Sequence, residues 1–409
     1  MRRWFAIPLW LRVIAAMVLG IALGLAMGEN AGAMRWIGDL FIRAIGMLVV
    51  PLIFFSLVAG VAALGDIAKL GRVGGRALLL FLVTGQIAAW LGIALGVLFE
   101  PGVGVAAGAQ SAPARAEAIS VAETIVRLVP ENPVKTMAEG EILPLIVFSL
   151  LLGVCILLAG REGRRAALFF DTGALLMQKM TFLVMELTPF GVFALMAWVA
   201  GTFGIDGLVP LASLVGLVYF GCLVVLFGVY GILVTALGRG SLLAFYRGIT
   251  DVMAVSFSTS SSSATLPVTL QCTQRNLGVS RSVASFVVTL GATINMSGTA
   301  VYLGVVTLFG AQIYDIALGP AQYVMIATLS TLGAVGAAGI PGAGIIMMAL
   351  VFGAIGVPLE VIALVAGVDR LMDMIRTTTN VAGDAAVALV VAKQTGELDV
   401  IELESADDV

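Results

Sequence analysis

The chain has 409 residues, of which 60% are hydrophobic and only 11% are charged, and its mean hydropathy is +1.10. No class of soluble globular protein has this composition, so we expect an integral membrane protein. The net charge of −3 says nothing about nucleic acid, because the basic residues lie in short loops rather than in one patch, and no nucleic-acid motif is present, so we expect no nucleic-acid partner. The absence of histidine excludes imidazole metal sites and histidine acid–base catalysis. The three cysteines have no metal or redox spacing, so we interpret them as packing residues.

Long apolar runs predict membrane-spanning helices near 8–28, 36–64, 74–99, 141–160, 178–203 and 207–238. The first run lacks a convincing cleavage site, so we expect it to be the first transmembrane helix rather than a signal peptide. A more polar stretch, 100–140, is expected to be an exposed loop. The amphipathic stretch 162–180 is expected to extend the fifth span along the membrane surface, and Pro189 is expected to kink that span.

Short basic loops indicate the orientation of the chain. Arginine and lysine cluster before the first span and after the second, fourth and sixth, whereas the connectors near 201–208, 311–320 and 356–360 have none. The positive-inside rule therefore predicts a cytoplasmic N-terminus and cytoplasmic basic loops. We expect the acidic tail to be solvated on the same side.

Two later segments are too broken for a simple membrane crossing. Residues 251–274 contain FSTSSSSATLPVT and residues 321–356 contain GAVGAAGIPGAG, and each is predicted to enter and leave on one face as a re-entrant hairpin. Unpaired backbone at a hairpin tip is tolerated at membrane depth only inside protein or beside a polar cavity. The span between them, 282–310, is itself interrupted at GATINMSGT. Two broken segments, one from each side, are typical of a secondary transporter with a midplane site.

The stretch Asp369–Asp384, DRLMDMIRTTTNVAGD, lies in an otherwise membrane-spanning segment between Val361 and Val391. Steps of four, three, four and four place positions 369, 373, 376, 380 and 384 on one helix face. A charge at bilayer depth costs about 3 kcal/mol, so such groups persist where they pair, meet a ligand or line a wet cavity. One interpretation is a salt-bridge ladder, Asp373 with Arg376, that only ties helices together. Five polar groups exceed what a tie requires, and we favour a solute site.

These groups suit a zwitterion with an extra carboxylate and a hard cation. The serine run 258–263 is enclosed by apolar flanks, so it is better interpreted as a hairpin tip offering N–H and hydroxyl groups to a carboxylate than as a linker. Arg376 presents a planar fork for a carboxylate, and Asp373 suits an ammonium. Asn295 and Asp384 offer oxygen ligands to a cation. The sequence IPGAG at 340–344 is either a helix kink or, as we favour beside the serine run, a mobile lid.

The order SSSATLPVT, GATINMSGT, GAAGIPGAG and DMIRTTTNVAGD resembles the glutamate transporter family, the dicarboxylate/amino acid:cation symporters. The similarity is strongest over about 250–396 and extends loosely into the N-terminal half. It implies an all-α membrane protein of the elevator type, with eight transmembrane helices and two re-entrant helical hairpins. It also implies a homotrimer in the inner (plasma) membrane with both termini cytoplasmic. The implied parts are scaffold helices 1 and 2 (1–72), helix 3 of the transport domain with an extracellular loop (73–140), scaffold helices 4 and 5 with helix 6 of the transport domain (141–238), the transport core (239–396) and the acidic tail (397–409).

The resemblance further implies roles for single residues. The implied substrate-binding positions are Ser261, Ser262, Ser263, Thr299, Gly344, Asp373, Arg376, Thr377 and Asn380. The serines would hold the α-carboxylate, Arg376 and Thr299 the side-chain carboxylate, and Asp373 the amine. One sodium site would consist of Gly291, Asn295, Asn380 and Asp384. The hairpin at 334–344 would be the extracellular gate. No cofactor is implied beyond the coupling cation, which is Na⁺, H⁺ or both.

Several positions depart from the family pattern. Ser297 replaces a carboxylate that usually helps to hold a third sodium, and Gly85 stands where related sequences often have serine. Leu303 lies where proton-carrying members have an acidic residue. Ser260 and Met374 occupy the two alternative positions of a supporting arginine. Fewer sodium ions, or protons carried by a carboxylate, are therefore both open.

From the sequence we expect a cation-coupled symporter for acidic amino acids, glutamate or aspartate, and not an enzyme. A C4-dicarboxylate symporter is the close alternative, against which Asp373 argues because such a solute offers it no cation. An intramembrane hydrolase using a serine of 258–263 would have no histidine base, and Lys393 lies near a helix end. An anion conductance is a further alternative as a side activity.

Overall fold

The computed structural model is helical throughout and describes residues 7–62, 73–105, 126, 129–238, 240–335, 339 and 341–398. The N-terminal half contains α2 (Leu9–Met27), the 3₁₀ helix η1 (Gly28–Met34), α3 (Arg35–Ala62), α5 (Gly75–Phe99), α7 (Pro133–Glu139), α8 (Ile142–Leu158), α9 (Arg164–Met185) and α10 (Thr188–Leu223). The α10 helix continues through the π-helix η3 (Val224–Val229), α11 (Tyr230–Ile232) and the π-helix η4 (Leu233–Leu237). The C-terminal half contains α12 (Leu242–Gly248), α13 (Thr250–Thr259), α14 (Ser262–Arg275), α15 (Arg281–Ile294), α16 (Ser297–Ile313), α17 (Pro320–Val335), α18 (Ala343–Ile355), α19 (Glu360–Ala366) and α20 (Asp369–Thr395).

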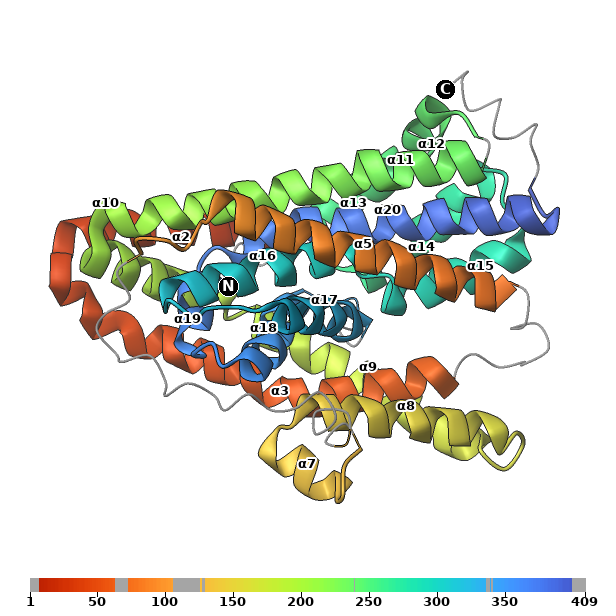
Figure 1. Cartoon of the computed structure of the whole chain (residues 1–409), viewed down its shortest axis with the longest axis horizontal. Helices are drawn as coiled ribbons and strands as arrows, with labels where there is room; N and C mark the ends of the chain where they lie inside the picture. Colours follow the sequence, from red (N-terminus) through yellow and green to blue (C-terminus); the bar gives the residue numbers. More distant parts are fainter. Residues whose placement is uncertain are drawn as a thin grey trace.

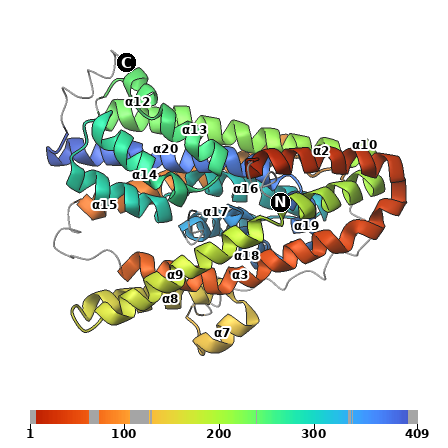
Figure 2. The ribbon, with the colours of Figure 1, turned by 180° about the vertical axis from the view of Figure 1, so that it is seen from behind.

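Most helices run along the long axis of the molecule (Figure 1). The later part of α10 and its continuation span nearly the whole length, and α5 and α20 run beside them. α3, α8 and α9 pack against one another on the opposite side, and this group is the lower one in both views (Figures 1 and 2). The short helices α16 to α19 therefore lie between two groups of long helices.

Several predicted spans agree with observed helices to within a few residues. The runs 8–28, 36–64, 74–99 and 141–160 correspond to α2, α3, α5 and α8. Within the described residues, five segments are long and apolar enough to cross a membrane: Leu9–Ala62, Gly75–Phe99, Arg164–Met185, Thr188–Leu237 and Arg281–Ile313. The total of eight transmembrane helices stays a prediction.

The fifth span differs from its prediction. We expected one helix over 178–203 with a kink at Pro189, but α9 ends at Met185 and α10 begins at Thr188. Pro189 lies in the first turn of α10, where its missing N–H has no intrahelical acceptor to lose, so it starts a helix instead of bending one. The predicted connector at 201–208 is a kink at Gly204, whose φ of 64° interrupts α10.

Both predicted hairpins are helix–turn–helix pairs. α13 and α14 meet at Ser260 and Ser261, while the turn between α17 and α18 includes Gly342. Of this second turn, 336–338 and 340 lie outside the described residues. Whether each pair enters and leaves on one membrane face stays a prediction.

Two helices form the centre of the protein. Every residue of α16 from Ser297 to Ala311 is buried, as is almost all of α20 from Asp369 to Ala392. α13, α14 and α15 pack on α20, and α5, α17 and α18 pack on α16. The interruption predicted near 291–299 is the break between α15 and α16 at Asn295 and Met296. Polar helix ends and hairpin tips thus converge around α20.

Candidate functional site

The polar face of α20 points into the protein. Asp369, Asp373, Arg376, Asn380 and Asp384 each have an exposed fraction of 6% or less. One unbroken helix carries all five, as their spacing predicts. Because charged side chains are almost never buried without partners, the contacts of each group show what the site requires.

Arg376 is held by two carboxylates and an aromatic ring. Its Nη2 donates to Asp373 Oδ1 at 2.8 Å, and its Nη1 lies 3.0 Å from Asp369 Oδ1. The guanidinium also lies 3.9 Å from the ring centroid of Tyr302, a cation–π contact worth about 2 kcal/mol when desolvated. The Asp373–Arg376 pair of the salt-bridge interpretation is therefore present. We expected each of these two groups to face a solute, and instead they face each other.

The two hairpin tips contact each other directly. At the first tip Ser260 adopts a left-handed backbone with φ of 51°, and Ser261 caps α14 by accepting from the Ala264 N–H. The Ser261 hydroxyl and the Ser263 N–H both donate to the carbonyl oxygen of Gly339, each at 3.0 Å. One backbone oxygen of the second tip therefore accepts both of these hydrogen bonds at the N-terminus of α14.

A small cavity lies between the hairpin tips, α16 and α20. Its volume is about 10 Å³, close to the space that one water molecule needs. A solute of amino-acid size can therefore enter only when a tip moves. The cavity is lined by Ser262, Met296, Thr299, Gly339, Ala343, Gly344, Asp373, Thr377 and Asn380.

Six of the nine predicted substrate positions line this cavity, namely Ser262, Thr299, Gly344, Asp373, Thr377 and Asn380. The other three, Ser261, Ser263 and Arg376, are not part of its lining. Ser261 and Ser263 are turned toward Gly339, and Arg376 lies behind the Asp373 carboxylate that it binds. The structure thus gathers most of the predicted set around one cavity, with its one arginine outside the lining.

At Gly344 the second hairpin packs directly against this cluster. A Cβ atom at position 344 would overlap the Arg376 guanidinium. The absence of a side chain here lets the first turn of α18 pack directly on Arg376.

The predicted cation positions form a second cluster next to the first. Asn295 Nδ2 donates to Asp384 Oδ1 and to the Asn380 carbonyl, both at 2.9 Å, and Gly291 lies against Asp384. The Ser297 hydroxyl donates to Asn295 Oδ1 at 3.2 Å. A half-turn of the Asn295 amide exchanges its NH₂ group for an oxygen, the ligand that a hard cation requires. The donor set therefore fits a small cation, although no group of three Asp, Glu, His or Cys suited to a metal occurs among the described residues.

Tyr230 belongs to this cluster although its sequence position did not indicate it. Its side chain is fully buried, and its hydroxyl makes no hydrogen bond within the described part of the chain. A Cβ on Gly383 would overlap that hydroxyl and would lie 2.5 Å from Asn295 Nδ2. A phenol oxygen thus points into the space beside Asn295, where Ser297 has replaced the carboxylate of the family pattern.

Sequence reasoning missed two residues at these two clusters, Tyr302 and Tyr230, and the partner of a third, Asp369. Tyr302 follows Thr299, the last residue of GATINMSGT, by about one helical turn, and this i, i+3 spacing could have revealed it. Asp369 was on the predicted polar face, but nothing local indicated that it binds Arg376. Tyr230 lies in an apolar run far from the other residues of the cluster, so no local pattern identifies it.

Comparison with known proteins shows the family of the chain. Residues 9–394 match the model of the Sodium:dicarboxylate symporter family. The chain belongs to the sodium:dicarboxylate symporter family. It is 36% identical over 408 residues to the proton/glutamate-aspartate symporter of Escherichia coli, covering 95% of this chain and 93% of that protein. It is 32% identical over 398 residues to the proton/sodium-glutamate symport protein of Bacillus caldotenax, covering 94% of each. It is 35% identical over 399 residues to a C4-dicarboxylate transport protein of Bacillus subtilis, covering 96% of this chain and 94% of that protein.

Membership confirms the family resemblance and the coarser part of the functional prediction. This sodium:dicarboxylate symporter is a multi-pass membrane transporter that couples solute movement to a cation, and it is not an enzyme. Its relatives are named for glutamate, for aspartate and for C4-dicarboxylates. Its solute is therefore of the dicarboxylate or acidic amino-acid type.

Proposed function

We propose that the chain carries acidic amino acids, glutamate or aspartate, into the cell together with Na⁺, H⁺ or both. The observation that carries this proposal is that the predicted binding groups form hydrogen bonds with other groups of the protein. The Gly339 carbonyl accepts from donors at the N-terminus of α14, and the Gly342 N–H donates to Asp373 Oδ2 at 3.0 Å. Asp373 Oδ1 accepts from Arg376. An oxygen, an N–H group and a carboxylate thus stand in for the α-carboxylate, the ammonium and the side-chain carboxylate of an acidic amino acid.

The second hairpin supplies two of these three stand-ins. When its tip moves away, Gly339 and Gly342 leave together, and their partners on α14 and α20 become free for a solute. The contacts given up are ordinary hydrogen bonds, worth about 1 kcal/mol each, with somewhat more for the one to the Asp373 carboxylate. A solute that restores them lets the tip close again, which is the property required of a gate.

Asn380 links the solute cavity to the cation cluster. Its side chain lines the cavity and accepts from the Gly298 N–H at 2.7 Å, while its carbonyl oxygen accepts from Asn295. We assign the cation to Asn295, Asp384, Gly291 and the Asn380 carbonyl. Both ligands act on the same helix break, so each stabilises the closed arrangement that the other binds.

The remaining features of the proposal follow the family resemblance. They are eight transmembrane helices with two re-entrant hairpins, a fixed scaffold and a moving transport domain, a homotrimer, and cytoplasmic termini in the plasma membrane. The 1–72, 73–140, 141–238 and 239–396 boundaries belong to the same proposal.

C4-dicarboxylates are the second candidate solute, favoured by one observation. A second buried guanidinium, that of Arg370, lies near Asp373, and it compensates the charge that a solute without an amine would leave unpaired.

Uptake by purified protein in proteoliposomes tests the proposal. Labelled L-aspartate, L-glutamate and succinate are supplied with a Na⁺ gradient or a pH gradient imposed separately. We expect accumulation of both amino acids under at least one gradient, and none in Asp384→Asn under either. Accumulation without any cation gradient, or Asp384→Asn with unchanged cation dependence, would contradict the assignment.

A further inference from the structure

Arg370 is a buried arginine that belongs neither to the predicted substrate positions nor to the cation cluster. Its exposed fraction is 6%, and it follows Asp369 at the start of α20. Its Nη2 donates to the Thr259 carbonyl, at the end of α13, at 3.3 Å. Its Nε and Nη1 make no hydrogen bond among the residues that the structure describes. Donors left unpaired in a dry interior are costly, so the unpaired atoms of Arg370 require an explanation.

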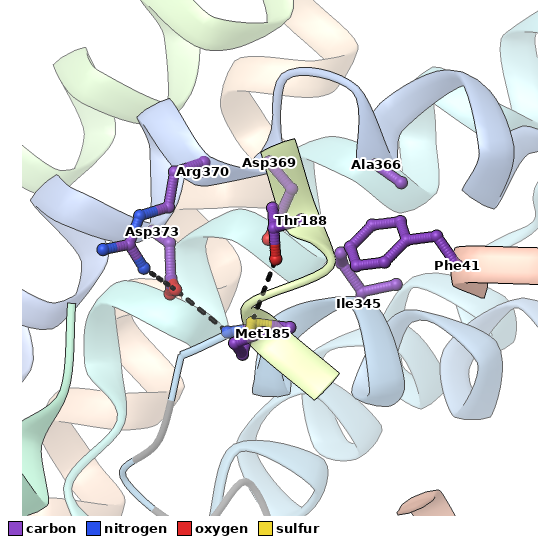
Figure 3. Close-up of a pocket in the computed structure, with 9 residues that line it drawn as sticks. Phe41, Met185, Thr188, Ile345, Ala366, Asp369, Arg370 and Asp373 are labelled. Carbon is purple, nitrogen blue, oxygen red and sulfur yellow. Dashed lines mark hydrogen bonds and ion pairs between the residues drawn. The ribbon is translucent and has the colours of Figure 1, made fainter. Parts of the chain in front are cut away.

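The free side of this guanidinium faces a cavity and a carboxylate. Figure 3 shows Arg370 beside Asp373 at one end of the cavity, with Phe41 at the other. The Nη1 atom lies 4.0 Å from Asp373 Oδ2, beyond hydrogen-bond distance. The cavity measures about 10 Å³, which leaves room for a small shift of the side chain toward that oxygen.

Asp373 is therefore shared by three partners. Oδ1 binds Arg376, while Oδ2 accepts from Gly342 and faces Arg370. When the hairpin tip moves away and a solute carboxylate takes Arg376, only Arg370 is left to compensate Asp373. A buried carboxylate without a counter-charge is strongly disfavoured, so the two side chains then close the remaining gap.

We propose that Arg370 is a specificity-determining positioning residue that competes with the solute's ammonium for Asp373. The proposal rests on the proposed function and deepens it, because it names the solute class. With Arg370 in place, a solute without an amine leaves no carboxylate unpaired, and a solute with an amine must displace a guanidinium. The site therefore binds C4-dicarboxylates as well as acidic amino acids.

Charge counting on α20 agrees with this competition. Asp369 and Asp373 balance Arg370 and Arg376, so the four groups carry no net charge. Neutralising Arg370 leaves one carboxylate in excess, which an ammonium compensates and a methylene group does not. The discrimination between the two solute classes should therefore increase.

L-Aspartate and succinate are the matched probes, because they differ only in the ammonium group. Their dissociation constants are measured on purified protein at one pH and one Na⁺ concentration, for the wild type, Arg370→Gln and Arg370→Lys. Glutamine keeps a donor for the Thr259 carbonyl but removes the charge, and lysine keeps the charge. Arg281→Gln, at an exposed arginine that begins α15, is the control for loss of an arginine elsewhere.

We expect the wild-type constants for the two probes to lie within about tenfold of each other. Arg370→Gln should shift their ratio toward aspartate by about tenfold, equivalent to about 1.4 kcal/mol. Arg370→Lys and Arg281→Gln should keep the wild-type ratio. A wild-type preference for aspartate well above tenfold overturns the proposal, and this result needs no variant to fold. An Arg370→Gln ratio within twofold of wild type, or an equal shift in Arg370→Lys, also overturns it. If the wild type binds neither probe, the proposed function itself fails.

Discussion

Replacing Arg376 by methionine separates the structural role of this residue from its role in binding. A bidentate contact with a solute carboxylate comprises two hydrogen bonds between charged groups, each worth about 1.5–3 kcal/mol. Arg376 must lose its hydrogen bond to Asp373 before it binds the solute. We therefore take the low end of the sum of the two hydrogen bonds, about 3 kcal/mol. This corresponds to a loss of affinity of roughly two orders of magnitude for both aspartate and succinate.

The same substitution leaves two buried carboxylates, Asp369 and Asp373, beside the one guanidinium of Arg370 on α20, so one negative charge is stranded. Removing one partner of a buried ion pair costs about 3–5 kcal/mol of stability, so Arg376→Met should unfold at a clearly lower temperature. Adding Asp369→Asn removes one stranded charge and should restore part of the stability while leaving binding lost.

The assay combines thermal unfolding at a fixed scan rate with equilibrium binding of both solutes. Arg281→Met is the control for the loss of an exposed arginine, and it should match the wild type in both measurements. A folded Arg376→Met variant that binds aspartate with the wild-type constant would refute the assignment of Arg376 to the solute carboxylate.

Three further predictions concern the surroundings of the site. Tyr230→Phe removes a buried hydroxyl without a hydrogen bond in the described chain, so the unfolding temperature should hold or rise, while the cation concentration for half-maximal uptake should increase several-fold. Gly344→Ala forces a methyl group into Arg376 and should cost about 1–3 kcal/mol of stability, measured by thermal unfolding, and weaken solute binding. The Ser282 and Ser280 hydroxyls donate to Glu397 and hold its carboxyl pKa below the ordinary glutamate value. This contact stabilises the fold at pH values above the ordinary glutamate pKa, and the stabilisation is lost as the pH falls through the lowered pKa. Glu397→Gln should therefore make the unfolding temperature fall less steeply as the pH is lowered.

Each of these predictions has a control and an outcome that contradicts it. Gly353→Ala is matched to Gly344→Ala, because it lies on the same helix and its added methyl meets no atom within 4 Å. Equal effects of the two would show that helix position, not Arg376, explains the loss. Unchanged cation dependence in Tyr230→Phe would exclude its hydroxyl from the cation path. If the unfolding temperature of Glu397→Gln falls as steeply at low pH as that of the wild type, other carboxyl groups cause the fall.

Much of the fold could be predicted because the bilayer restricts local structure. Apolar runs of sufficient length must form helices, so α2, α3, α5 and α8 lie within a few residues of their predicted bounds. The break between α9 and α10 could not be placed, because Glu186 alone interrupts the apolar run there and the position of a proline within a helix depends on where that helix starts.

The contents of the site were also partly predictable. The spacing of Asp373, Arg376 and Asn380 on one helix depends only on helix geometry, and the motif order identified the family that the comparisons confirm. Six predicted positions line one cavity. The sequence offered the Asp373–Arg376 pairing as one interpretation but could not decide it, because these two groups contact each other as readily as they contact a solute.

Composition and periodicity were sufficient to establish a helical membrane protein with buried charges on one face of its last long helix. Those properties follow from chain-local rules, namely the length needed to span lipid and the repeat of the helix. Packing between distant segments decided which partner each polar group meets. The Gly339 oxygen reaches Ser261 across 78 residues, Arg370 reaches Thr259 across 111, and the Tyr230 hydroxyl lies over Gly383. Such contacts depend on how the helices cross, and no local spacing in the chain encodes that arrangement.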